Sequence, residues 1–291
     1  GQVLATDGAG SITFADSYSP ELYAENPVLP TSPSATGESA VAIGSGSTAT
    51  GAFGSAIGRN VTASGQDSLA LNSGTTASGS YSIAGGLSTD AYGSYSFAFG
   101  QNQAVSGANS VGIHGDTSAG RQTAIGHNSL GGSAVTVTGG GAVALNGSYA
   151  SGSDSFAASV KGNTSTYGAT GTSSVSIGRL AKATGTDAVA YGAQTVASGN
   201  YSTALGLGAQ ATGSYGVALG YNTVASGSLT ATAIGCDSSG GGSLASGSGS
   251  VALGGGEASA TEAISIGAFS DATGLNAVAL GRQAQATGST S

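Results

Sequence analysis

The sequence predicts an all-β parallel solenoid, a roll of fourteen-residue coils stacked on one another. Glycine recurs every fourteenth residue, alanine recurs at two fixed places between the glycines, and short segments alternate apolar and small residues. A fixed short period is typical of repeats that contact only their neighbours. Fourteen residues are too few for two helices with their turns, but they suffice for two short strands and two turns.

The repeating glycine is taken as position 1 of each coil, and it stands at 37, 51, 65, 79, 93 and 107, then at 171, 185, 199, 213 and 227. Position 8 is also usually glycine. We expect the glycines at positions 1 and 8 to supply the left-handed backbone of two tight turns. Asn72 and His114 replace glycine at position 8, and both residue types tolerate that conformation better than most.

The first strand of each coil covers positions 5 to 7, and the second lies near positions 12 to 14. Val41-Ala42-Ile43 and Val217-Ala218-Leu219 show the strict alternation of a strand. Thr48-Ala49-Thr50 represents the second strand. Alanine at positions 6 and 13 is expected to face inward across a narrow interior.

The side chains at positions 5 and 7 have the opposite parity and are expected to point outward as a long apolar stripe. Such a stripe is not left bare on a soluble monomer. A symmetric homotrimer that buries three stripes around one axis is the economical solution, with a dimer or a monomeric roll capped by another domain as alternatives. The predicted trimer core comprises Val41, Ile43, Leu69, Leu71, Phe97, Phe99, Val175, Ile177, Val217, Leu219, Val251, Leu253, Val278 and Leu280.

Residues 1–36 are expected to form a separate N-terminal element, and residues 37–291 the roll. The segments 3–6 and 11–14 flank Asp7-Gly8, a dipeptide typical of hairpin turns. All 4 prolines follow between Pro20 and Pro33 and favour an extended connector. About 17 coils at ~4.8 Å per stacked strand give a roll about 80 Å long. The last coil begins at Gly288, so we expect the parent molecule to continue.

Three coils are longer than the period allows: Gly120–Gly139, Gly152–Gly171 and Gly227–Gly247. Their extra residues follow the apolar strand, near 127–138, 160–170 and 235–246. Insertions in solenoids form loops that are often functional, although neutral variation at a tolerant edge explains them equally well. The candidate receptor residues in these loops are Asn128, Lys161, Tyr167 and Asp237.

Composition and residue spacing argue against several functions. The net charge is −8 with only 6 Lys and Arg, which disfavours binding to nucleic acid or to an anionic membrane surface. No apolar run is long enough to insert this segment into a membrane. His114 and Asp116 lie close in sequence, and Cys236 is the single cysteine, but neither completes a metal site or a nucleophilic dyad. We therefore expect no catalytic residues, no cofactor, no metal and no enzymatic activity.

Aromatic residues recur at position 3, as Phe53, Tyr81, Tyr95, Tyr201 and Tyr215. Rings of neighbouring coils are expected to stack along one edge of the roll. Packing between turns explains this row, and a sugar-binding platform is the alternative.

The unit Gly-x-x-Ser-Val-Ala-Ile-Gly-x-x-x-x-Ala-x resembles the head repeats of trimeric autotransporter adhesins, the YadA-like head. The segments 37–50, 107–115, 171–184 and 247–260 carry the resemblance, which covers nearly all of 37–291. It implies a left-handed parallel β-roll, a homotrimer, and attachment to a host cell, a matrix protein or a glycan from a bacterial cell surface. Collagen-binding members carry an Asn-Ser-Val-Ala-Ile-Gly-type strand, and the nearest match here, 109–114, departs from it at Gly112 and His114.

The first ten residues, Gly1 to Gly10, also resemble segments of phage tail fibres, some of which carry YadA-like repeats. A phage tail or capsid fibre for host attachment is therefore an alternative reading. A passive structural spacer that binds nothing is the third.

Overall fold

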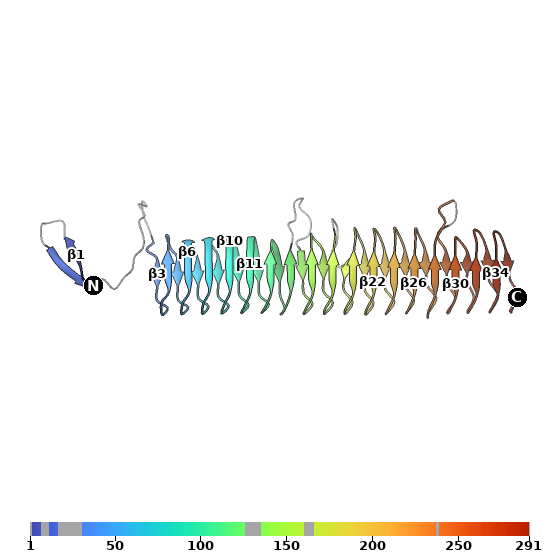
Figure 1. The fold of residues 1–291 in the computed structure, drawn as a ribbon, viewed down its shortest axis with the longest axis horizontal. Coiled ribbons are helices and arrows are strands. Elements are labelled where there is room, and N and C mark those ends of the chain that lie inside the picture. Colours follow the sequence, from blue (N-terminus) through green and yellow to red (C-terminus); the bar gives the residue numbers. More distant parts are fainter. Residues whose placement is uncertain are drawn as a thin grey trace.

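The computed structural model describes residues 2–6, 12–16, 31–125, 135–159, 166–236 and 239–290. Within them the chain forms a parallel β-solenoid of about 17 coils with a spacing of ~14 residues and no helix, as the sequence predicts. Figure 1 shows the coils stacked in chain order along one straight axis.

Two series of strands run along the roll. Most first strands are β4 (Val41–Ile43), β6 (Ser55–Arg59), β8 (Leu69–Ser73), β12 (Val111–Ile113), β14 (Thr123–Ile125), β16 (Val143–Leu145), β18 (Phe156–Ala158), β20 (Val175–Ile177), β22 (Val189–Tyr191), β24 (Thr203–Leu205), β26 (Val217–Leu219), β28 (Thr232–Ile234), β30 (Val251–Leu253), β32 (Ile264–Ile266) and β34 (Val278–Leu280).

Most second strands are β3 (Ser34–Ala35), β5 (Thr48–Ala49), β7 (Thr62–Ala63), β9 (Thr76–Ala77), β13 (Gly115–Thr117), β15 (Val135–Val137), β17 (Tyr149–Ala150), β19 (Gly168–Ala169), β21 (Lys182–Ala183), β23 (Val196–Ala197), β25 (Gln210–Ala211), β27 (Val224–Ala225), β29 (Leu244–Ala245), β31 (Glu257–Ala258), β33 (Asp271–Ala272) and β35 (Gln285–Ala286). Two longer strands, β10 (Ile83–Ala91) and β11 (Phe97–Val105), run through both series.

Each strand pairs in parallel with the strand of its own series in the next coil, so that Val189 pairs with Thr203, and Thr203 with Val217. The roll therefore has two sheets joined by two rows of turns. We call the turns at positions 1 to 4, before each first strand, the first-turn edge. The turns at positions 8 to 11, between the first and second strands, are the second-turn edge.

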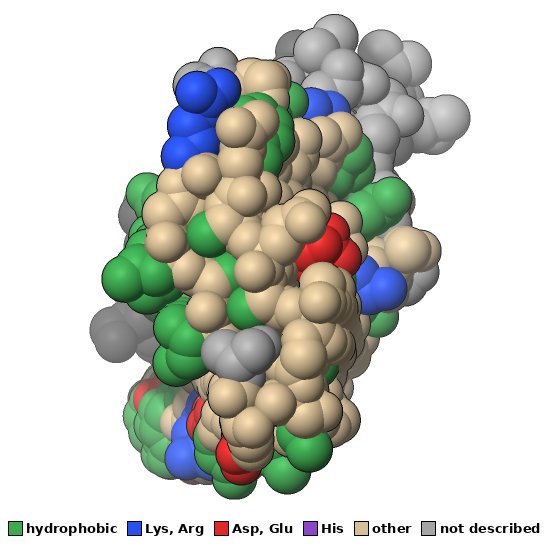
Figure 2. All heavy atoms as spheres, turned by 90° about the vertical axis from the view of Figure 1, so that its right-hand side faces the viewer, with side chains coloured by type: hydrophobic (Ala, Val, Ile, Leu, Met, Phe, Trp, Pro, Cys, Tyr) green, Lys and Arg blue, Asp and Glu red, His purple; other side chains and the backbone are tan. Residues whose placement is uncertain are grey.

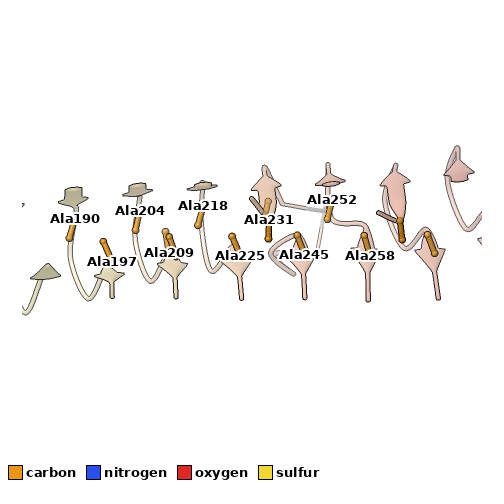
Figure 3. Packing of buried hydrophobic residues seen from close by; sticks show 14 of the residues in the cluster. Ala190, Ala197, Ala204, Ala209, Ala218, Ala225, Ala231, Ala245, Ala252 and Ala258 are labelled. Atoms are coloured by element: carbon orange, nitrogen blue, oxygen red, sulfur yellow. The ribbon is translucent and has the colours of Figure 1, made fainter. Parts of the chain in front are cut away.

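The interior consists of the predicted alanines. Ala190 and Ala204 at position 6 and Ala197 and Ala211 at position 13 are fully buried. Figure 3 shows alanines of the two strand series pointing toward each other between the sheets. The coil is too narrow for larger side chains at most levels, so the hydrophobic surface within one chain is modest.

The glycine at position 1 is needed for a different reason than the sequence suggested. Gly199 does not have a positive φ, but a Cβ on it would overlap the carbonyl oxygen of Gly213 in the next coil. The prediction of a left-handed backbone is wrong at position 1, where close approach of stacked backbones favours glycine, although Ala119 and Ala260 occupy this position in two coils. It is confirmed at position 8, as at Gly220 with φ 130°. In the first turn the left-handed residue is at position 3, as at Tyr201 with φ 58°.

Outside the roll, β1 (Gln2–Thr6) and β2 (Ile12–Asp16) pair antiparallel, with Leu4 opposite Phe14. The predicted turn at Asp7-Gly8 and most of the Pro-rich connector lie outside the described residues.

The register of the roll changes near residue 107. Val105 pairs with Thr117 and Val111 with Thr123, so this coil has twelve residues and the next begins at Ala119. The sequence placed the start of that coil at Gly120, which is wrong by one residue. The missing residues come from the second turn, which shrinks to the corner around His114.

Two buried glutamines replace the missing backbone partners around this short coil. Gln103 donates to the carbonyl oxygen of Gly112 at 3.0 Å and accepts from the amide of Gly115 at 2.9 Å. Gln122 accepts from the amides of Ser118 and Ala119 and donates to the carbonyl oxygen of Gly139. Buried backbone groups need such partners, so these side chains keep the ladder continuous where the backbone cannot.

The three predicted insertions lie between a first strand and the following second strand, as expected. They separate β14 from β15, β18 from β19, and β28 from β29. The third long coil also has one extra residue in the first turn, before β28. Thr232 of β28 pairs with Val217 of the preceding coil, which is fifteen residues earlier instead of fourteen. Coils with a shortened second turn adjoin these insertions, as the pairings of Val137 with Ala150 and Ala245 with Ala258 show.

Candidate functional site

The outward side chains at positions 5 and 7 form one apolar face along the first strands. Strand register places Ile177, Tyr191, Leu205 and Leu219 in one row, and Val175, Val189, Thr203 and Val217 in the row beside it. All predicted trimer-core residues lie in these two rows. The prediction omitted others with the same parity, which the alternation could have supplied: Ile57, Ile83, Val111, Ile113, Ile125, Val143, Leu145, Phe156, Val189, Tyr191, Leu205, Ile234, Ile264 and Ile266.

The apolar face is accessible in the single chain. Val41 is 43% exposed, Phe99 46% and Leu205 44%. Figure 2 looks along the roll from its C-terminal end and shows hydrophobic side chains along its left-hand side. A face this long exceeds the apolar patches found on most soluble monomers.

The outward side chains at positions 12 and 14 form a polar face on the opposite sheet. Position 14 is serine or threonine in each described coil from Thr36 to Thr287, except at Tyr92. Position 12 varies more and includes Asp90, Lys182 and Gln210, with Val196, Val224 and Leu244 as apolar exceptions. Only the sheet of first strands therefore presents a continuous apolar face.

Within the apolar face one bulky side chain fills a gap left by a glycine. The ring of Phe99 lies where a Cβ on Gly85 of the preceding coil would be. Phe97 and Phe99 stack with ring centroids 6.0 Å apart. The packing of Phe99 over Gly85 keeps the apolar face flat at the coil that contains two phenylalanines.

A similar exchange explains why the strand resembling the collagen-binding motif departs from it. Gly112 at position 6 faces Val105, which stands where most coils have alanine, and a Cβ on Gly112 would overlap the Val105 side chain. The glycine therefore belongs to the internal packing of the short coil.

The first-turn edge carries the aromatic row, and its rings stack as predicted. Tyr81 and Tyr95 have centroids 4.8 Å apart and an interplanar angle of 7°, and Tyr201 and Tyr215 have centroids 5.0 Å apart at 10°. All four occupy the left-handed backbone region, which is costly for bulky residues. Each ring covers one face of its neighbour.

Of the candidate receptor residues, Asn128, Lys161 and Asp237 lie outside the described residues. Tyr167 is half-buried beside β19. At the base of the third loop, Cys236 and Gly242 form an isolated antiparallel β-bridge through their backbones. The side chain of Cys236 is an exposed free thiol.

The described residues include no group of three or more His, Cys, Asp or Glu that could hold a metal ion. A helix long and apolar enough to cross a membrane is not found among them either.

The family model for the YadA head domain repeat, in two copies, matches residues 35–60, 63–89, 77–102, 169–195, 183–209, 197–223, 211–235, 258–284 and 272–291. These overlapping matches cover more than half of the chain. A comparison with the curated proteins finds no match. YadA-like heads are extracellular parts of adhesin-type surface fibres and are generally non-enzymatic. The repeats, their register and the family match together place this chain in the family of YadA head domain repeats.

Proposed function

We propose that three copies of the chain pack their apolar faces around one axis and form a fibre head that attaches to a host cell, matrix protein or other surface receptor. The exposed apolar face carries this proposal, because it runs along the roll while the opposite face is polar. Burial of apolar area stabilises an assembly by about 25 cal/mol per Å².

A cyclic trimer fits the shape of the face. Each first strand contributes only two outward side chains, so the face is narrow, and three narrow sheets can close a core without leaving one exposed. The family to which the chain belongs is of the homotrimeric adhesin kind.

The test of assembly is the mass of the native protein by light scattering. We expect a trimer for the unmodified chain and loss of assembly for Val217→Asp with Leu219→Asp, because buried unpaired charges are costly. Gln210→Asp with Thr212→Asp is the matched control, since it adds the same charges to the polar face nearby. A stable monomer of the unmodified chain would refute the trimer.

Selective attachment is assigned to the three inserted loops. The repeats present similar surfaces at every coil and suit weak multivalent contact, whereas recognition of one receptor needs a locally distinct surface. Shortening the three loops to the regular period leaves the strand ladder intact, so the variant should fold and lose binding to the target surface. Full binding by the folded, trimeric variant would show that the repeats themselves recognise the receptor.

A further inference from the structure

The two edges of the roll carry complementary side chains at matching heights. We propose that the first-turn edge of one copy packs against the second-turn edge of the next copy, and that this contact fixes the axial register of the fibre. The inference rests on the proposed trimer and adds a second, lateral contact to the one made by the apolar faces.

Charge is divided between the edges. The second-turn edge carries Arg59, Arg179 and Arg282 and, in the part of the chain that the structure describes, no acidic side chain. The first-turn edge carries Glu38, Asp67, Asp154, Asp187 and Glu262, with Arg121 as its basic exception. All of these side chains are exposed. Figure 2 shows basic side chains at the upper edge of the roll, and acidic and hydrophobic side chains together with basic ones at the lower edge.

The charges lie at matching heights along the axis. Arg59 is in the second turn directly before the first turn that holds Asp67, and Arg179 stands in the same relation to Asp187. Each pair differs in height by less than one coil, about 4.8 Å. Rotation about an axis parallel to the roll preserves height, so in a cyclic assembly Arg179 and a neighbour's Asp187 lie at almost the same level. Within one chain they sit on opposite edges, so their pairing requires a second copy.

The sizes of the side chains on the two edges are also complementary. Leu87 and Leu207 on the second-turn edge are 45% and 46% exposed, and they lie at the levels of Tyr95 and Tyr215. The tyrosines one coil earlier, Tyr81 and Tyr201, lie at the levels of the small residues Ser73 and Ala193. At these levels the rings lie opposite leucine or a small residue, and two of the five acids, Asp67 and Asp187, lie opposite arginine.

A covering copy also accounts for the cost of these tyrosines. The left-handed position favours glycine, asparagine or aspartate, and a tyrosine there is less stable. Stacking returns part of that cost for each pair, and burial against a neighbouring copy offsets more of it.

The pattern occurs at two heights in the roll. Arg59, Asp67, Tyr81, Leu87 and Tyr95 recur, with the same spacing, as Arg179, Asp187, Tyr201, Leu207 and Tyr215. The apolar face differs between the two stretches, where Leu71 corresponds to Tyr191 and Phe97 to Val217.

A closed cyclic trimer requires zero axial shift between copies, and the edge pattern favours this register over slipped arrangements more strongly than the apolar face does. One coil resembles the next on that face, so a slip of one coil costs little there. A slip at the edges moves arginine away from aspartate and leucine away from the ring, and charged groups are effective at fixing register.

The test is site-directed cross-linking of the full chain with Cys236→Ser. Ala193→Cys with Tyr201→Cys places two thiols on opposite edges at one level, and a short bismaleimide should join them between chains to give covalent dimers and trimers. Ala193→Cys with Tyr81→Cys is the matched control, because its thiols lie at distant levels and should give none. A variant that is trimeric by light scattering but does not cross-link overturns the edge contact and leaves the trimer standing. A monomeric parent overturns both.

Charge reversal provides a second measurement. Asp187→Arg and Arg179→Asp should each lower the melting temperature of the trimer, and the double exchange should restore most of the loss. Additive losses would contradict the pairing. If the assembled protein binds a free oligosaccharide and Tyr201→Ala abolishes that binding without lowering the melting temperature, the rings are a carbohydrate platform and the proposal is wrong.

Discussion

Residues 171–225 and residues 103–150 belong to one roll, yet their coils close in different ways. In the first stretch every coil has the full period, the interior is alanine with small hydroxyl residues, and backbone bonds such as that from the amide of Val196 to Ala209 complete the ladder. In the second stretch a coil is shortened and the next is lengthened, and buried Gln103, Gln122 and Val105 occupy the interior.

The difference shows that the ladder, not the coil length, is the invariant of this fold. Where residues are lost, inward side chains supply the donors and acceptors that the backbone no longer provides. Smaller side chains do this at other short turns, as when Ser148 accepts from the amide of Leu145 at 3.0 Å and donates to the carbonyl oxygen of Ala157 at 2.8 Å.

The largest effect is expected from Gln122→Ala in the irregular stretch. It leaves two amides and the carbonyl oxygen of Gly139 without their partner, and unsatisfied buried groups cost roughly 1–3 kcal/mol each where water cannot replace the bond. We expect a loss of about 3 kcal/mol, measured by denaturant unfolding of the assembled protein at fixed concentration.

Its matched control is Ser174→Ala at the same position of a regular coil. Ser174 makes one hydrogen bond, to the carbonyl oxygen of Gly171 at 2.7 Å, so its loss should cost about 1 kcal/mol. Equal losses in the two variants would refute the idea that glutamine holds the short coil together.

A transplanted pair tests the packing difference. Ala197→Val should destabilise the regular stretch by about 1–3 kcal/mol, because its neighbour across the interior, Ala204, leaves no space. Adding Ala204→Gly copies the Val105 and Gly112 arrangement and should recover part of that loss. Thermal unfolding of the single and double variants measures the coupling, and strictly additive effects would contradict it.

Within the regular stretch itself, Ser202→Ala should change stability little. The Ser202 hydroxyl is buried with no hydrogen-bond partner, unlike that of Ser174 at the same position of another coil. Replacing an unpaired buried hydroxyl by a methyl group removes a desolvation cost. A loss as large as that of Ser174→Ala in denaturant unfolding would contradict this assignment.

The smallest effect concerns an exposed pair on the polar face. Tyr92 donates to the Asp90 carboxylate at 2.7 Å, and this bond, followed by burial and the charge of Asp90, raises the pKa of Tyr92 above 10.0. Because the folded-state pKa is raised, the bond stabilises the fold below the ordinary pKa and is lost as pH rises through the raised value. Asp90→Asn should lower the pKa of Tyr92 in an ultraviolet titration, and Tyr92→Phe should remove that step; an unchanged pKa in Asp90→Asn would contradict the assignment.

The regular coils were predictable from sequence because one rule, small residues inward and apolar residues outward, holds at most of their positions. The rule fails where inward side chains make the hydrogen bonds that backbone groups make in the regular coils. Gln103 and Gln122 stand at inward positions where most other coils have serine, threonine or alanine, and a glutamine there could have indicated the short coil. The left-handed backbone conformation of the stacked tyrosines was not predictable, because backbone preference alone assigns that conformation to glycine or asparagine.

The apolar face was predicted from parity, but the edge contact proposed above was not. Arg179 and Asp187 look like ordinary surface charges in the sequence, and only the stacking of coils reveals their common height. The candidate residues Asn128, Lys161 and Asp237 remain predictions.

Neighbour-only pairing also bears on how the roll folds and varies. Each new coil closes a loop of about one period onto a coil already formed, so folding can proceed by addition and its entropic cost per step does not grow with the length of the roll. A coil lengthened from fourteen to about twenty residues raises that closure cost by only ~0.3 kcal/mol. The second-turn edge can therefore accept a loop at almost no penalty to folding, provided that the ladder on either side resumes in register.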